Sequence, residues 1–578
     1  MAEETNSLVL TGDKAVDLAA GPSKKAAKKA EAKAKKEALK AQRAAERVVV
    51  ASADNEAEED PAKDFYGPAT AALLNSFSPG AEDVSLRAIN ESHVGKTVII
   101  RAWLQNTRMQ GAKMAFVELR EEGNWAIQGI VTASADPKPE GDPTPICSRR
   151  MVKWVGAVNP EGFVTVEATV QKPFSPVKSC RVTDFELHIS KFFVISPAPA
   201  TLGMTLAAAS RAVTNFSDEE STPEEGTQEK DAEGGPPAAS MLTHLDNIVM
   251  HKRSPVQQAI ADIRVEAKHL FRSYLREHGF KEFEPPCLIG AASEGGANVF
   301  AMPYFNQKAY LAQSPQFYKQ FEIAGGRKRV FSIGPVFRAE NSNTPRHMTE
   351  FTGLDMEMEI RKDYSEVLRM LEGVLLHIFH GIQKHCAAEV ELIRSVYPSP
   401  EILLPEPGKE VRLTFAEAQK LLREEGPAEF RNVRDDEDMS TPQEKALGAL
   451  VREKYKTDFF AVDKFPEAAR PFYAKVDPTS KPTEQVTNAF DMFLRGQEIL
   501  SGGERICDPD ELETRIRAKG VDPTSPGIKE YIGVFREAGV PPHGGGGIGL
   551  DRVVAWYLAL PSVHLAAYYP RTPKRLLP

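Results

Sequence analysis

The chain has 578 residues, of which 42% are apolar and 26% are charged, with a formal net charge of -9. A chain of this length has room for roughly two to four domains. No stretch approaches the ~18 consecutive apolar residues that a membrane helix needs, and the opening residues MAEETNSLVL lack the basic-then-apolar order of a secretory signal. The five cysteines show no CxxC spacing, so neither a disulfide framework nor a zinc site is expected. These features predict a multidomain cytoplasmic protein that does not enter a membrane.

Residues 1–84 are predicted to form a largely disordered N-terminal extension with a lysine-rich helix at about residues 23–47. That segment holds ten Lys or Arg and three Glu among many alanines, a composition that favours a helix. It has almost no apolar stripe with which to join a core. Two interpretations therefore stay open: a solvated charged tail, or a basic arm that binds the phosphate backbone of a nucleic acid.

Residues 85–197 predict a small all-β domain. Gly, Asn and Pro turn signals separate successive β-rich runs, which is typical of a barrel or sandwich of about five strands. The pattern alone assigns no ligand. The runs are TVIIRAWLQNTR, MAFVELREEG, WAIQGIVTAS, GFVTVEATVQK and FELHISKFFVIS.

Residues 198–250 are predicted to be a hinge between two folded parts. The segment at about residues 216–240 has eight acidic residues, one lysine and several Gly and Pro. Such a segment cannot bury enough apolar surface to offset the entropy lost on ordering, so we expect it to be disordered.

Residues 251–578 predict a large α+β domain, an antiparallel sheet flanked by helices. Ser254 as N-cap, Pro255 in the first turn and Gly279 as the stop delimit a long helix. The run KEFEPPCLI predicts a strand broken by prolines, and later β-rich runs alternate with the helical run YSEVLRMLEGVLLHIFHGIQKH. Neither GxGxxG nor GxxxxGK[ST] occurs, so Rossmann and P-loop chemistry are not supported.

Two charged clusters come early in this domain. In ASEGGANVF, Glu294 precedes a glycine pair that can form a mobile flap carrying a carboxylate, or only a tight turn. In QSPQFYKQF, Gln316 and Lys319 are three residues apart and share one helical face. They could address one ligand with an amide and a cation, or could form the edge of an amphipathic helix.

A third cluster is the run FRAENSNTPRHMTEF, which predicts a hairpin. We expect one strand to carry Arg338 and Glu340, and the return strand to carry Arg346, His347 and Phe351. Guanidinium groups match phosphate in a bidentate manner, and an aromatic face can stack on a purine. A charged hairpin tip can equally be solvated surface.

The fourth cluster is C-terminal, in FDMFLRGQEILSGGERICD and PPHGGGGIGLDRVVAWYLAL. Asp491 and Glu498 are carboxylates of the kind that hold Mg2+ beside substrate phosphates. The glycines from Gly544 to Gly547 allow a close approach of backbone. Arg552 falls near the start of an apolar helix, where a basic residue and free N–H groups both favour phosphate.

Three of these runs resemble, in their order, the signature motifs of class II aminoacyl-tRNA synthetases: FKEFEPP, FRAE with RHMTEF, and GGGIGLDR. The runs SEGG, QSPQFYKQ, TEFTGLDMEM and EILSGGERI resemble the aspartyl members of subclass IIb in their eukaryotic cytosolic form. The resemblance implies a class II catalytic domain preceded by an OB-fold barrel. It also implies an ATP-dependent ligase that forms aspartyl-adenylate, releases pyrophosphate and transfers aspartate to the 3′-terminal adenosine of aspartate tRNA.

The resemblance implies roles for individual residues. Arg338, Arg552 and Glu498 would act in catalysis, and Asp491 and Glu498 would hold Mg2+. Aspartate would be bound by Glu294, Gln316, Lys319, Arg338, Asp355, Ser501 and Arg505. ATP would be bound by Arg338, Glu340, Arg346, His347, Met348, Phe351, Glu498, Gly549, Leu550, Asp551 and Arg552.

The barrel would bind the anticodon through Phe116, Gln128 and Glu186, since single-stranded RNA is read by stacking and by hydrogen bonds to base edges. The alternative for Phe116 is a place in the barrel core. The resemblance also implies a homodimer through the first motif, around Pro286.

Two alternative functions stay open. One is an asparaginyl- or lysyl-tRNA synthetase, although Lys319 and Arg505 favour an acidic substrate side chain. Asparagine in such a pocket would leave two desolvated cations without an anion, which is costly. The other is a catalytically dead RNA-binding relative, against which the intact Arg338, Glu498 and Arg552 argue.

Overall fold

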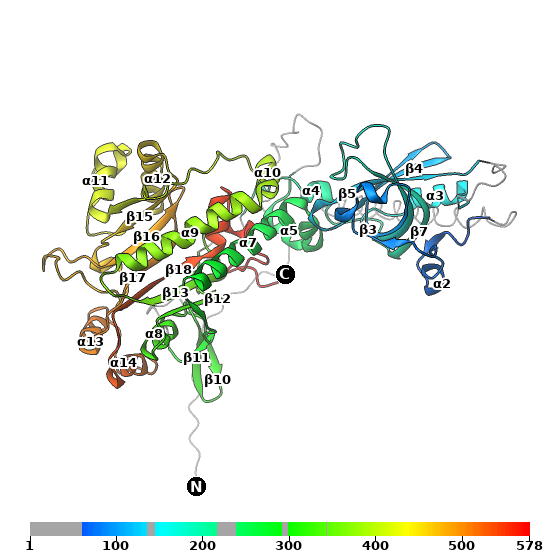
Figure 1. The fold of residues 1–578 in the computed structure, drawn as a ribbon. Helices are drawn as coiled ribbons and strands as arrows, with labels where there is room; N and C mark the ends of the chain where they lie inside the picture. The colour runs from blue at the N-terminus through cyan, green and yellow to red at the C-terminus, as the bar shows by residue number, and fades with distance from the viewer. Residues whose placement is uncertain (1–59, 136–144, 217–237, 292–298, 343, 578) are drawn as a thin grey trace, which may run out of the picture. The chain divides into compact units, whose positions relative to one another are not determined.

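The computed structural model describes residues 60–135, 145–216, 238–291, 299–342 and 344–577 (Figure 1). The predicted lysine-rich helix and most of the predicted acidic segment lie outside these ranges. The chain divides into two compact units, one ending at Ala198 and the other continuing from Pro199, with Glu122–Asn124 grouped with the second. No helix within the described ranges is both long and apolar enough to cross a membrane.

The first unit is a closed β-barrel. Its strands are β3 (Thr97–Gln110), β4 (Met114–Arg120), β5 (Ala126–Thr132), β6 (Phe163–Gln171) and β7 (Glu186–Ser196). β5 pairs with β7, and β6 pairs with both β3 and β7, which closes the ring. Helix α3 (Arg149–Ala157) lies between β5 and β6 in the chain. This order is that of an OB fold, and the five predicted strands are confirmed.

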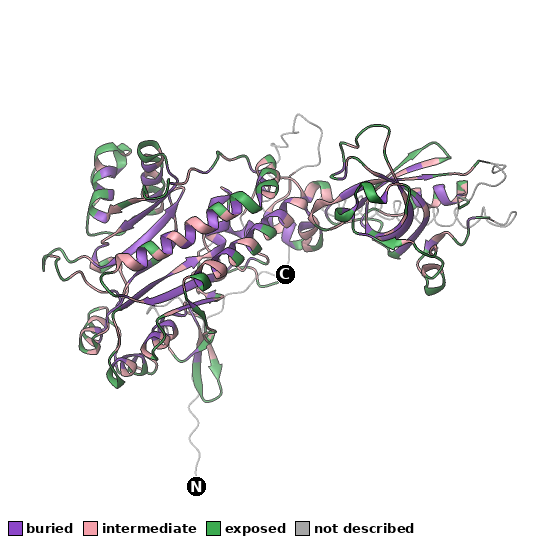
Figure 2. Cartoon of the chain, in the orientation of Figure 1, coloured by how far each residue is buried: buried purple, intermediate pink, exposed green. Residues whose placement is uncertain are grey.

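Alternation along the strands places the barrel core. The barrel strands show buried and less buried stretches in Figure 2. In β4, Ala115, Val117 and Leu119 are buried in the barrel cluster, whereas Phe116 is only half-buried and lies outside that cluster. The interpretation of Phe116 as barrel core is therefore wrong. Short strands β1 (Tyr66–Pro68) and β2 (Glu82–Asp83) extend the sheet, so strand structure begins earlier than the sequence indicated.

The second unit is built on an eight-stranded sheet whose order is β14-β15-β16-β17-β18-β13-β12-β8. Every neighbouring pair is antiparallel except β14 with β15 and β12 with β8. A small sheet joins β9 (Leu288–Ile289), β10 (Ala301–Tyr304) and β11 (Gln307–Leu311). The strands of the large sheet are β8 (Lys281–Glu282), β12 (Arg329–Phe337), β13 (Glu350–Glu359), β14 (Val411–Thr414), β15 (Phe459–Asp463), β16 (Ala489–Leu494), β17 (Gln497–Glu504) and β18 (His543–Gly549).

Long helices cover this sheet (Figure 1). Helix α7 (Pro255–Glu277) begins after its N-cap Ser254, and Gly279 follows with φ +81°, as the sequence predicted. Its buried face and that of α9 (Ser365–His385) form one core with the sheet. The other α-helices of this unit are α8 (Gln316–Ala324), α10 (Ala387–Val396), α11 (Phe415–Glu425), α12 (Thr441–Tyr455), α13 (Pro509–Ala518), α14 (Ile528–Glu537) and α15 (Leu550–Tyr557), with the short α4 (Leu206–Ala209), α5 (Met241–Asp246) and α6 (Ile248–Arg253). The short α2 (Ala71–Leu74) belongs to the first unit.

Candidate active site

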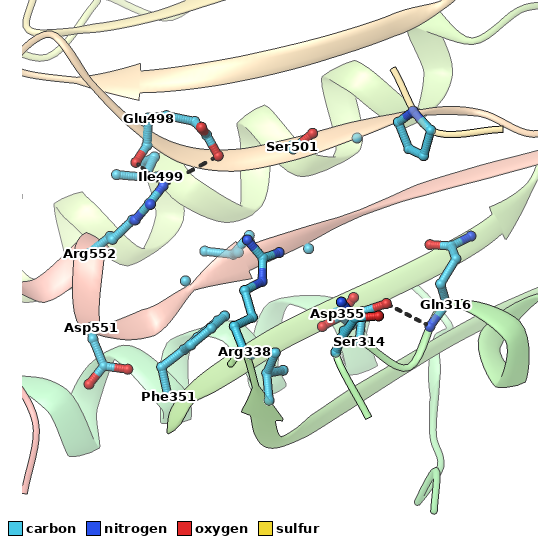
Figure 3. A pocket seen from close by; sticks show the side chains of 18 of the residues that line it. Ser314, Gln316, Arg338, Phe351, Asp355, Glu498, Ile499, Ser501, Asp551 and Arg552 are labelled. Atoms are coloured by element: carbon cyan, nitrogen blue, oxygen red, sulfur yellow. Dashed lines mark hydrogen bonds and ion pairs between the residues drawn. The ribbon is translucent and has the colours of Figure 1, made fainter. Parts of the chain in front are cut away.

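One cavity of about 330 Å³ in the second unit gathers most of the predicted site residues (Figure 3). Glu294 lies outside the described residues. Leu550 is fully buried in the core, and Asp491 is not among the cavity's lining residues. The predicted residues that line the cavity are Gln316, Lys319, Arg338, Glu340, Arg346, His347, Met348, Phe351, Asp355, Glu498, Ser501, Arg505, Gly549, Asp551 and Arg552.

The predicted hairpin exists, but its strands are displaced from those predicted. β12 ends at Phe337 and pairs with Glu350 at the start of β13. The predicted strand residues Arg338, Glu340, Arg346 and His347 therefore lie in the connecting segment and not on the strands, which corrects the prediction. The Arg338 N–H still donates to the Thr349 carbonyl oxygen at 2.9 Å. The turn-forming run that ends in Pro345 keeps the remaining residues out of the ladder.

The loop places cations beside an aromatic ring. The Arg338 guanidinium lies 5.6 Å from the centre of the Phe351 ring, and its Nη1 is 3.8 Å from Glu340 Oε1. His347 Nδ1 lies 2.6 Å from Thr344 Oγ1. Burial lowers the pKa of His347, and the nearby Arg552 charge lowers it further. The His347 imidazole and the Arg338 guanidinium thus face the same cavity.

Arg552 projects from the first turn of α15 toward Glu498 on β17 (Figure 3). Its Nη1 lies 3.4 Å from Glu498 Oε1. The preceding residue, Asp551, points away from the cavity's middle and accepts hydrogen bonds from Arg264 Nη1 at 2.5 Å and from the Thr352 N–H at 3.1 Å. The Asp551 carboxylate therefore ties α15 to α7 and β13, and holds Arg552 in position.

Arg346 has a partner that the sequence reasoning missed. Its Nη2 donates to Glu444 Oε2 at 2.8 Å, and its Nη1 donates to Thr441 Oγ1. Burial raises the pKa of Glu444, against the opposing effect of Arg346. Glu444 lies on α12, about a hundred residues further along the chain, and no local pattern marks it.

Asp491 forms an ion pair with Arg470, and neither residue lines the cavity. Arg470 donates to both carboxylate oxygens, at 2.9 and 2.6 Å. Burial raises the pKa of Asp491, and the neighbouring Glu498 charge raises it further, while Arg470 opposes both. Among the described residues no group of three or more His, Cys, Asp or Glu side chains is placed to hold a metal by itself. Any cation here needs additional ligands, such as phosphate oxygens.

The other end of the cavity is closed by a buried network of four charges. Lys319 Nζ lies 3.0 Å from Asp355 Oδ1 and 3.5 Å from Glu357 Oε2. Arg505 donates to Glu357 through Nε at 2.9 Å and through Nη2 at 3.3 Å. All four side chains are buried. Burial alone would raise the pKa of Glu357, but Arg505 and Lys319 outweigh it and hold that pKa below its ordinary value.

This network corrects one step of the sequence reasoning. Lys319 and Arg505 were expected to lack an anion in the absence of an acidic substrate, yet Asp355 and Glu357 already balance both charges. Glu357 was not predicted as a site residue. The alternation of Asp355 and Glu357 along TGLDMEMEIR was the available signal, since residues two apart in a strand share a face.

The glycine strand β18 makes room for this network. A Cβ built on Gly545 would lie 2.0 Å from the Met356 carbonyl oxygen and 2.2 Å from Glu357 Oε2. Both contacts are far below van der Waals distance, so a side chain at this position is excluded. The close backbone approach expected from the glycine run is therefore an approach of β18 to β13 and to the Glu357 carboxylate.

The three predicted anticodon residues lie on adjacent strands of the barrel. Gln128 Nε2 donates to Glu186 Oε2 at 3.2 Å, and His188 Nε2 lies 3.0 Å from Glu186 Oε1. Phe116 carries the Arg108 guanidinium 5.0 Å from its ring centre. Phe116 and Gln128 lie on the face of β4 and β5 opposite to the core residues.

Comparison with known proteins gives a consistent result. Residues 240–573 match the family model for tRNA synthetases class II (D, K and N). The chain is 41% identical to the cytoplasmic aspartate–tRNA ligase of Bos taurus, over 90% of this chain and 96% of that protein.

Two solved structures place the fold in the same group. The aspartyl-tRNA synthetase of Entamoeba histolytica superposes with a TM-score of 0.74 at 34% identity, covering 90% of this chain and 97% of that one. Asparaginyl-tRNA synthetase of Pyrococcus horikoshii gives a TM-score of 0.67 at 27% identity, over 86% of this chain and 100% of that one. The chain therefore belongs to the class II tRNA synthetases of the D, K and N group, in the family of cytoplasmic aspartate–tRNA ligases.

Proposed function

We infer that the chain is an aspartate–tRNA ligase, which activates aspartate with ATP and transfers it to tRNA in the cytoplasm. The observation that carries this inference is a single cavity with two different ends. One end holds Arg338 beside Phe351 and Arg552 beside Glu498. The other end holds the buried Lys319 and Arg505. The first end suits a nucleotide, and the second, where Lys319 and Arg505 lie beside Asp355 and Glu357, offers groups of both signs to an amino acid.

Activation requires two anions to approach each other, the substrate carboxylate and the α-phosphate of ATP. We propose that Arg338 contacts both, so that its charge lies where negative charge develops. Phe351 and Arg552 would enclose the adenine, and Arg346 and His347 would contact the remaining phosphates. Catalysis would then rest on positioning and electrostatics, without a side-chain nucleophile.

We propose that the substrate's side-chain carboxylate binds Arg505 and Lys319. Arg505 uses Nε and Nη2 for Glu357, which leaves the Nη1 edge of the guanidinium as the donor for the substrate. Gln316, Asp355 and Glu294 would surround the substrate ammonium. Ser501 would help to place the reacting carboxylate, as the resemblance implies.

Mg2+ is proposed as the metal that accompanies ATP, where it would neutralise charge on the phosphates. Glu498 lines the cavity and offers a carboxylate of the type that Mg2+ accepts alongside phosphate oxygens. Asp491 is proposed as the second ligand, and its binding would compete with the Arg470 ion pair.

Two further proposals concern partners. Phe116, Gln128 and Glu186 would bind anticodon bases, which is supported by the position of Phe116 and Gln128 on the outer face of the barrel and by the hydrogen bond of Gln128 to Glu186. A homodimer through the first motif around Pro286 is supported by exposed apolar side chains, with Val265 52% and Leu288 48% exposed. Sedimentation analysis tests the dimer, because a monomer at micromolar concentration contradicts it.

ATP–pyrophosphate exchange with aspartate, asparagine and lysine tests the function. We expect exchange with aspartate, and much weaker exchange with the other two because neither has a side-chain carboxylate to present to Arg505. Strong exchange with asparagine and none with aspartate would overturn the assignment. Aminoacylation of tRNA excludes the catalytically dead alternative.

A further inference from the structure

A chain of hydrogen bonds runs behind the cavity, away from the reacting atoms. Gln316 Nε2 donates to Gln320 Oε1 at 2.9 Å. Gln320 Nε2 lies 2.9 Å from His543 Nε2, and His543 Nδ1 lies 2.8 Å from the Pro541 carbonyl oxygen. Gln316, Gln320 and His543 are all buried.

The direction of every bond in this chain is fixed from its far end. A carbonyl oxygen can only accept, so His543 Nδ1 must carry the proton and donate to Pro541. In a neutral ring Nε2 is then an acceptor, and Gln320 must turn its amide nitrogen toward it. The Gln320 oxygen consequently faces Gln316, which must turn its own nitrogen toward Gln320.

Gln316, the last residue of this chain, therefore presents its amide oxygen to the cavity. Figure 3 shows the Gln316 amide with its oxygen toward the middle of the cavity and its nitrogen turned away. Tyr531 strengthens the assignment, because its hydroxyl donates to the same Gln320 oxygen at 2.9 Å. If the Gln320 amide were flipped, its nitrogen would face two donors, Tyr531 Oη and Gln316 Nε2, and both hydrogen bonds would be lost.

We propose that His543 and Gln320 are positioning residues for the substrate α-ammonium, because they fix Gln316 with an acceptor directed at the cavity. The inference rests on the proposed role of Gln316 in aspartate binding and deepens it. A Gln316 amide held the opposite way would direct N–H groups at a positively charged ammonium. This chain of hydrogen bonds from Pro541 to Gln316, called the relay below, would thus favour an α-amino acid over a diacid that lacks the amino group.

The relay requires a neutral His543, and its surroundings favour that state. Glu357 from β13 and Arg505, the residue after β17, act on the ring with opposite charges. The Phe535 ring stacks on it with the ring centres 6.3 Å apart, and Cys507 Sγ lies 3.4 Å from Nδ1. Burial lowers the pKa of His543 below its ordinary 6.5. Protonation would give Nε2 a hydrogen, which Gln320 Nε2–H cannot accept.

A pair of inhibitors isolates this effect. One is a non-hydrolysable aspartyl-sulfamoyl adenosine, and the other is the same compound without its α-amino group. In the full-length Gln320→Met variant we expect affinity for the amino compound to fall about tenfold, the loss of one hydrogen bond to a charged group. Affinity for the desamino compound should change less than about threefold, since Gln316 has no ammonium to meet.

The desamino compound also controls for folding, because an unfolded or collapsed cavity would bind neither compound. Equal losses for both compounds would overturn the inference, as would full affinity of the variant for the amino compound. Failure of the proposed function has a different signature. The unsubstituted enzyme would then bind both compounds equally well. That result would contradict the proposed contact of Gln316 with the ammonium, and the positioning role of Gln320 and His543 would lose its basis.

Gln320→Glu supplies a rescue test. The introduced carboxylate accepts from Gln316, from Tyr531 and from a protonated His543, so the direction of the relay toward the cavity is kept. Affinity for the amino compound should stay within about threefold of the unsubstituted enzyme, whereas a loss matching that of Gln320→Met would overturn the argument. Its charge should also raise the pKa of His543, so a two-dimensional NMR titration of the labelled ring should show a higher pKa than in the unsubstituted enzyme, and an unchanged pKa would count against the contact.

Discussion

Glu357 is the residue on which the buried network depends most. Replacing it by glutamine keeps the shape but removes the charge that balances Arg505 and Lys319. One of the two Arg505 hydrogen bonds would also be lost, because the glutamine nitrogen would face a guanidinium donor. We expect Glu357→Gln to destabilise the second unit and to raise KM for aspartate, since Arg505 would no longer be held toward the cavity.

The expected loss of unfolding free energy is about 3 kcal/mol, the lower end of the range for breaking a buried ion pair by removing one partner. The pH dependence has a definite sign. The pKa of Glu357 is lowered in the folded state, so its carboxylate stabilises the fold above the unfolded pKa of about 4.5 and loses that effect as pH falls through the folded pKa. The difference between the two proteins should therefore be constant from about pH 5.5 to 8 and shrink in stronger acid.

Native-state hydrogen exchange of β13 and β17 peptides measures this loss without interference from the barrel. Glu513→Gln is a matched control. The Glu513 carboxylate also meets two cations, Arg517 at 2.7 Å and Arg536 at 2.8 Å, but it lies on the surface. We expect little change in the unfolding free energy of Glu513→Gln, because an exposed ion pair contributes little. If Glu357→Gln lost no more unfolding free energy than Glu513→Gln, the charges of the buried network would not stabilise the fold as argued.

Three further predictions concern the nucleotide end and the extension. Arg552→Ala should abolish ATP–pyrophosphate exchange while leaving the circular dichroism spectrum unchanged, and near-normal exchange would contradict its role. Glu444→Gln should raise KM for ATP about threefold to tenfold by loosening Arg346, with KM for aspartate unaffected; equal changes in both would indicate a general disturbance. Deleting residues 1–50 should weaken tRNA binding most at low salt and leave exchange intact, and an unchanged tRNA affinity would return the basic segment to a solvated tail.

Much of the fold could be predicted from local sequence, because its signals are local. Pro255 and Gly279 delimit α7, and alternating apolar residues define the five barrel strands. The ends of β12 and β13 were harder to predict from the sequence. Whether Arg338 joins a strand depends on where the ladder stops, which the turn around Pro345 decides and side-chain alternation does not reveal.

The site residues also divide into those that local sequence reveals and those that it does not. Residues in contiguous motifs, such as Arg338 and Arg552, were found because each motif carries its own chemistry. Glu444, Gln320 and His543 act on residues that are distant in sequence or on the hidden side of a helix. Their signal is the direction of a hydrogen bond or the partner of a charge, and both emerge only when the chain is folded.

The glycine strand β18 also restricts how the selectivity of this cavity can change. A methyl group at Gly545 would collide with the backbone carbonyl of Met356, which no rotamer change can relieve. At Gly547 the nearest atom is instead Asp355 Oδ1, at 3.1 Å, so an alanine there would press on the substrate end itself. Substitution along β18 is thus restricted most at Gly545, and α8, β13 and β17 are the elements through which a new amino-acid preference can arise with the least disturbance.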